Sequence, residues 1–169
     1  MFWRGVLGYL PVNIVQGVVG LLTLVVFTRL LSPEAFGVYA LAFSVTSLVH
    51  TSLFTWIEAA VARFSAPEAM EGREAPHTAT VFGLWAILAI GLPVIAAGLL
   101  LVWPMNSALK IAVAAGLAGS LPRSLAKLVQ ERRRAAGEVG AAASLDMIQT
   151  AGGFALGAAF AALGAGGAG

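Results

Sequence analysis

Cysteine is absent from the 169 residues, and charge is scarce: Asp, Glu, Lys and Arg together make up 11% of the chain. Without cysteine, the chain has no disulfide framework and no thiolate metal site. Soluble domains carry roughly 25% charged residues, whereas this chain is 59% hydrophobic. Lipid is therefore the expected solvent, and an integral membrane protein is the expected class.

The motifs of several enzyme classes are also missing. The sequence contains no HExxH zinc spacing, no GxSxG nucleophile turn and no Walker or dinucleotide-binding glycine motif. Its two histidines, His50 and His77, are 27 residues apart, which disfavours a metal site. We therefore expect no catalytic residues, no metal and no cofactor. Catalysis by charged residues near the membrane interfaces stays open, but no pair has a spacing that specifies a reaction.

Long apolar segments dominate what the sequence does contain. None alternates with the two-residue period of barrel strands, and each is long enough for a helix to cross about 30 Å of hydrocarbon. A signal peptide is the competing interpretation of the first segment, but no small-residue cleavage site follows it before Arg29. We predict a single all-α, polytopic transmembrane bundle over 1–169 with about five spans: 6–30, 36–62, 79–103, 108–130 and 140–165.

The segment ends and connections carry further signals. Ser32, Pro33 and Glu34 are typical of a helix start, because serine caps, proline suits the first turn and glutamate favours the positive end of the helix dipole. Asn106 can cap a later helix in the same way. Residues 63–78 are predicted to form a solvated connector. The glycine-dense final segment is weakly specified by itself, so we expect a chain truncated at its C-terminus.

Basic residues predict the orientation. With a cytoplasmic N-terminus, eight basic residues fall on the inner side and only Arg29 and Lys110 on the outer side. The run Arg132–Arg134 could indicate nucleic-acid binding, but beside a span it is better interpreted as a topology signal. We therefore expect an N-terminus on the cytoplasmic side and no nucleic-acid partner.

Polar residues recur at helical spacing inside the apolar segments. Serine and threonine hydroxyls in such positions often bond their own helix or hold helices together, whereas an ionisable group normally faces a wet cavity. In the second segment such residues form one polar strip, which comprises Ser44, Ser47, Thr51, Thr55 and Glu58. His50 lies off this strip and is interpreted as a packed or interfacial histidine.

Two other segments repeat this pattern. Asn13 and Gln16 share one face of the first segment. Asp146 begins a polar face in the last segment, where it either favours the helix N-terminus or lines a pathway. The spacing of Gly153 and Gly157 predicts a close helix approach. Three polar faces together indicate a bundle that encloses water.

The stretch Arg29-Leu-Leu-Ser-Pro-Glu-Ala-Phe-Gly-Val-Tyr39 resembles the first helix turn of the polysaccharide and O-antigen flippases. These belong to the multidrug/oligosaccharidyl-lipid/polysaccharide exporter superfamily. The resemblance implies a multi-pass cytoplasmic (inner) membrane transporter of two bundles, of which this chain supplies most of the first. It also implies that a lipid-linked oligosaccharide and membrane lipids are partners, with other envelope polysaccharide biosynthesis proteins as further candidates.

Under this hypothesis the polar helix faces bind the sugar, and Arg29 and Arg123 attract the diphosphate of the lipid-linked oligosaccharide. Candidate ion-coupling groups are Glu58 and Asp146. A drug or metabolite exporter of the same superfamily, an intramembrane glycan polymerase or ligase, and a non-catalytic scaffold are the alternatives. The candidate substrate-binding residues are Asn13, Gln16, Arg29, Ser47, Thr51, Thr55 and Arg123.

Overall fold

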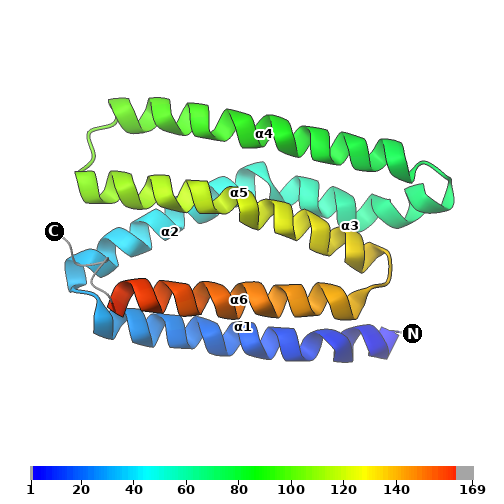
Figure 1. Cartoon of the computed structure of the whole chain (residues 1–169), viewed down its shortest axis with the longest axis horizontal. Coiled ribbons are helices and arrows are strands. Elements are labelled where there is room, and N and C mark those ends of the chain that lie inside the picture. Colours follow the sequence, from blue (N-terminus) through cyan, green and yellow to red (C-terminus); the bar gives the residue numbers. More distant parts are fainter. Residues whose placement is uncertain (1, 163–169) are drawn as a thin grey trace. The chain divides into compact units, whose positions relative to one another are not determined.

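The computed structural model describes residues 2–162, with the side chains of residues 10–162 (Figure 1). Every regular element in that range is a helix, which confirms the all-α class. The predicted end of the last span, residues 163–165, lies outside the described residues. The elements are α1 (Phe2–Leu30), α2 (Pro33–Leu53), α3 (Thr55–Met70), α4 (Glu74–Val102), α5 (Ser107–Ala135) and α6 (Val139–Ala162).

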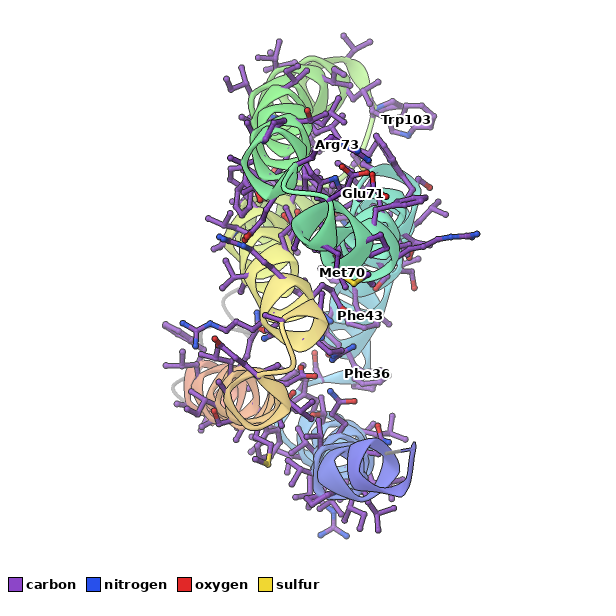
Figure 2. All side chains as sticks on the ribbon, turned by 90° about the vertical axis from the view of Figure 1, so that its right-hand side faces the viewer. Phe36, Phe43, Met70, Glu71, Arg73 and Trp103 are labelled. Carbon is purple, nitrogen blue, oxygen red and sulfur yellow. The ribbon has the colours of Figure 1, made fainter. Side chains whose placement is uncertain are left out.

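Three of these helices have the length and apolar composition of a membrane span. Among the described residues they cover Leu10–Leu30, Pro33–Leu53 and Glu74–Val102. Trp103 follows the last of them and is 61% exposed at the end of α4 (Figure 2). Tryptophan is enriched at membrane–water interfaces, so its position fits a span that ends there. The chain is a helical membrane protein, and the count of five spans stays a prediction.

Both predicted helix starts are confirmed. Ala35 donates its backbone N–H to Ser32 Oγ over 3.2 Å, and α2 begins at Pro33. Leu109 donates its backbone N–H to Asn106 Oδ1 over 2.8 Å at the start of α5. Each side chain satisfies one of the backbone donors that a helix leaves unpaired in its first turn.

The predicted span 36–62 and connector 63–78 need correction. The helix that begins at Pro33 is interrupted at Phe54, continues as α3 to Met70, and leaves only 71–73 as a connector. Within that connector Gly72 has a φ of 73°, a left-handed conformation that glycine adopts without strain. Ion pairs with Arg73, including one from Glu71, tie the turn together (Figure 2). Pro67 does not end the helix: it lies inside α3, which continues to Met70.

The helices form two compact units. One holds α1 and α6, which pack side by side, and the other comprises residues 38–137 with α3, α4, α5 and most of α2. In the first unit a Cβ at Gly157 would lie 3.1 Å from Phe27 Cζ, whereas Gly153 has no neighbour within 4 Å of that position. The predicted close approach is therefore confirmed at Gly157 and wrong at Gly153.

The larger unit contains two apolar cores. The first is formed by Ala42, Phe54, Leu92, Val113 and Leu117. The second is formed by Ile57, Val61, Val81 and Leu128. Trp85 and Leu88 of α4 pack against both. The interruption at Phe54 falls where one core gives way to the other.

Candidate functional site

An ionisable pair lies across the interruption between α2 and α3. His50 Nε2 is 3.2 Å from Glu58 Oε1, and the two side chains are only 19% and 15% exposed. His50 also stacks at an angle on Phe54, with ring centroids 5.7 Å apart. Charged groups are rarely placed among apolar helices unless they are paired or functional, so this pair marks the candidate site of the larger unit.

Helix α5 brings cations to the same place. The charges of Arg123 and Lys127 act on both His50 and Glu58, and Glu131 acts on Glu58. Arg123 is exposed, whereas Lys127 is half-buried. These residues recur every four positions and therefore share one face of α5. The site thus combines an acid, a histidine and two cations on facing helices.

A hydrogen bond fixes the neighbouring helix. Trp85 Nε1 of α4 donates to Ser124 Oγ of α5 over 2.9 Å, and Ser124 is fully buried. Ser124 in turn donates to the Leu121 carbonyl over 2.8 Å. Because Ser124 follows Arg123 directly, this contact sets the rotation of α5 that presents the cations.

The predicted polar strip of the second segment does not lie on one straight helix. The interruption at Phe54 leaves Ser47 and Thr51 on α2 and places Thr55 and Glu58 on α3. Ser47 is half-buried, Thr51 and Thr55 are exposed, and Glu58 is half-buried. Ser44 donates to the Ala40 carbonyl over 2.8 Å, which is the local bond that serine often makes within a helix. Of the predicted residues, Glu58 and Arg123 are brought together.

The remaining predicted residues belong to the α1–α6 unit. Asn13 and Gln16 are exposed on α1, and Arg29 is exposed in its last turn. Asp146 of α6 is buried and engaged with other residues. Asn13, Gln16 and Arg29 are thus accessible to a substrate, whereas Asp146 belongs to the packed interior of its unit.

A family model for polysaccharide biosynthesis proteins matches residues 2–131, well over half of the chain. This chain belongs to the polysaccharide biosynthesis protein family. The membership confirms the flippase-type family indicated by the turn at Arg29–Tyr39 and gives the protein a role in polysaccharide biosynthesis. Helix α6 lies beyond the matched residues. No curated protein and no solved structure gives a significant match.

His50 of this polysaccharide biosynthesis protein is packed, as predicted, since its side chain is 19% exposed and its ring lies against Phe54; sequence reasoning missed only its contact with Glu58. A straight helix through 36–62 places it about 100° away from the strip, so it was expected to be a packed histidine. The bend also brings it into contact with Glu58. The signal that could have found it is its chemistry, because an ionisable residue inside an apolar segment is a functional candidate whatever its helical phase.

Proposed function

We propose that this chain is part of a flippase that moves lipid-linked oligosaccharides from the cytoplasmic to the outer leaflet of the inner membrane, with its N-terminus in the cytoplasm. The proposal makes the protein a transporter and not an enzyme. Its family membership supports a role in polysaccharide biosynthesis, and its long apolar helices support a membrane location. The polar side chains on those helices are the reason to propose transport in addition to a membrane location.

The exposed amides of α1 are the decisive observation. Asn13 and Gln16 lie within the span Leu10–Leu30 and are exposed. An amide left without partners in hydrocarbon costs several kcal/mol. A water-filled cavity beside these side chains removes that cost. It also offers hydrogen bonds to sugar hydroxyls, while the lipid tail of the substrate stays in the bilayer.

The charged groups divide between substrate and energy source. In this proposal Arg29, at the outer end of α1, and Arg123, beside Glu58, attract the diphosphate of the lipid carrier. Ser47, Thr51 and Thr55 add hydroxyl contacts. Glu58 or Asp146 couples movement to a cation gradient, since one charge crossing 100 mV gains about 2.3 kcal/mol.

A reconstituted assay tests this function. The complete flippase that contains this chain, placed in liposomes that carry a fluorescent lipid-linked oligosaccharide, should expose the label of the inner leaflet to an outside quencher, at a rate that protein-free liposomes do not reach. We expect Arg29→Ala to slow this turnover and Lys110→Ala, the other outer cation, to leave it unchanged. Equal rates for both variants would remove Arg29 from the mechanism.

The same assay separates the alternatives. Turnover of a fluorescent drug but not of the oligosaccharide would favour an exporter, and lengthening of the glycan would indicate a polymerase or ligase. No movement of either substrate would favour a scaffold. Glu58→Gln should abolish the response of turnover to an imposed gradient; a retained response would exclude Glu58 as the coupling group.

A further inference from the structure

The bend between α2 and α3 has no cause in the local sequence. Helices kink sharply at proline, at glycine or where a side chain disturbs the hydrogen-bond ladder, and residues 38–66 contain neither proline nor glycine. The regular helix is nevertheless interrupted at Phe54: its N–H still bonds the His50 carbonyl over 2.9 Å, but its φ of −111° departs from the usual helical value of about −63°. Figure 1 shows the ribbon changing direction between α2 and α3. The cause must therefore lie in tertiary contacts.

The His50–Glu58 contact can form only if the helix bends. Eight residues of straight α-helix separate the two Cα atoms by about 12 Å and rotate them by about 80°. In addition, helical side chains tilt toward the N-terminus, which points His50 away from Glu58. The observed 3.2 Å between Nε2 and Oε1 is thus a contact of the bent form and is lost in the straight one.

Different buried residues hold the helix on the two sides of the bend. Phe54 is 1% exposed and belongs to the first core, whereas Ile57 and Val61 belong to the second. The buried residues of the two cores are different, although Trp85 and Leu88 of α4 pack against both. A change of angle at Phe54 therefore leaves the buried members of each core together and is accommodated at Trp85 and Leu88.

The bent form also carries an internal cost. Within the described residues, Thr46 Oγ1, His50 Nδ1 and Glu58 Oε1 are buried without a hydrogen-bond partner, so the contact between His50 Nε2 and Glu58 Oε1 is a close approach of charges and not a well-aligned hydrogen bond. Each such buried polar atom destabilises the conformation that holds it. Opposing this cost is the attraction between His50 and Glu58. The charges of Arg123 and Lys127 on α5 attract the Glu58 carboxylate but repel a protonated His50, so they do not reinforce the contact as a whole. A conformation stabilised by one polar contact and destabilised by three orphaned atoms is poised for change.

We propose that the His50–Glu58 contact is a latch that holds the second transmembrane helix bent at Phe54, and that breaking it lets residues 33–70 straighten toward one continuous helix. The proposal goes beyond flippase activity, because it concerns the conformation of this helix whatever the protein transports. His50 and Glu58 act here as positioning residues. They set the direction of α3, and with it the position of Thr55 at the start of that helix.

Distance measurements between two spin labels test the latch. The chain has no native cysteine, so labels can be placed at Phe43→Cys and Phe64→Cys, whose side chains are exposed on α2 and α3. A straight helix would separate these positions by about 32 Å. We expect a shorter distance in the otherwise unchanged protein in lipid nanodiscs, and a shift toward the straight-helix value in Glu58→Gln and in His50→Gln.

Two further variants make the result decisive. The exchange His50→Glu with Glu58→His keeps both groups and should restore the short distance. Glu68→Gln, an acid at the far end of α3, should leave the distance unchanged. Folded single variants that keep the short distance would overturn the latch, as would an exchange variant that stays long. Where Glu58→Gln does not fold, His50→Gln and the exchange variant decide. The readout does not depend on oligosaccharide turnover, so the latch can fail or stand separately from the flippase proposal.

Discussion

Gly116 on α5 faces Thr46 on α2, and a Cβ at the glycine would overlap Thr46 Oγ1. The two helices therefore approach as closely as they do because position 116 has no side chain. We expect Gly116→Ala to lower the free energy of unfolding by about 1–3 kcal/mol, since the added methyl group must push the helices apart. Gly119, one turn along α5, has nothing within 4 Å of its Cβ position and supplies the control. Thermal unfolding in detergent should separate the two variants, and equal melting temperatures would contradict the close approach.

A similar pair tests the packing of α1 on α6. Gly157→Ala places a methyl group 3.1 Å from Phe27 Cζ, and Phe27 is buried, so its ring has little room to move. We expect a loss of about 1 kcal/mol in the free energy of unfolding. Gly153→Ala, in open space, should be neutral or gain up to about 1 kcal/mol from its better helix propensity. A destabilising Gly153→Ala with a neutral Gly157→Ala would place the contact elsewhere.

The hydrogen bond from Trp85 to Ser124 can be measured by a double-mutant cycle. Trp85→Phe removes the donor and part of a side chain that packs against both cores, and should cost about 1–3 kcal/mol. Ser124→Ala leaves a partly buried indole N–H unpaired and should cost about 1–3 kcal/mol. Because both changes remove the same bond, the double variant should cost less than the sum. Strict additivity in urea or detergent unfolding would mean that the bond contributes nothing.

The connector between α3 and α4 should show a pH response. Arg73 donates hydrogen bonds of 2.8 and 3.1 Å to Glu68. This hydrogen bonding lowers the pKa of the Glu68 carboxyl below its ordinary value. A carboxyl with a depressed pKa in the folded state stabilises the fold above its unfolded pKa, and that contribution is lost as the pH falls through the folded pKa. Both side chains are solvent-accessible, so the effect is local. NMR titration of the Glu68 carboxyl should show its pKa rise in Arg73→Gln.

Arg63→Gln is the control for this titration. Arg63 lies over the ring of Phe64, with its Cζ 5.6 Å from the ring centroid, and the pairs made by Arg73 do not involve it. The pKa of Glu68 should therefore be the same in Arg63→Gln as in the unchanged protein. A shift of equal size in both variants would mean that overall charge, and not the hydrogen bond from Arg73, lowers the pKa.

Local features of this protein could be read from the sequence because their causes act within a few residues. The start of α2 at Pro33 and of α5 at Ser107 follows from side chains that bond the next turn. The length of the apolar helix α4 follows from the number of consecutive apolar residues in its sequence. The family signal at Arg29–Tyr39 is a contiguous stretch, and the match over 2–131 confirms what it indicated.

The candidate site was only half predictable for the opposite reason. Glu58 and Arg123 could be singled out as ionisable residues in apolar segments, but their proximity depends on α3 packing against α5. The contact of His50 with Glu58 was missed because helical phase was extrapolated through Phe54 as if the helix were straight. No residue near 54 announces the bend, and the loss of helical phase there changes which side chains meet.

The amino-acid sequence by itself determined that this protein is helical and membrane-bound, where α2 and α5 begin, and which family it belongs to. Composition, capping and short motifs depend only on residues that are close in the sequence, so they can be recognised without knowledge of the fold. Tertiary structure alone decided that α2 and α3 part at Phe54 and that His50 meets Glu58. Those outcomes depend on the packing of α2 and α3 against α4 and α5 in two apolar cores, which are contacts between residues distant in the chain.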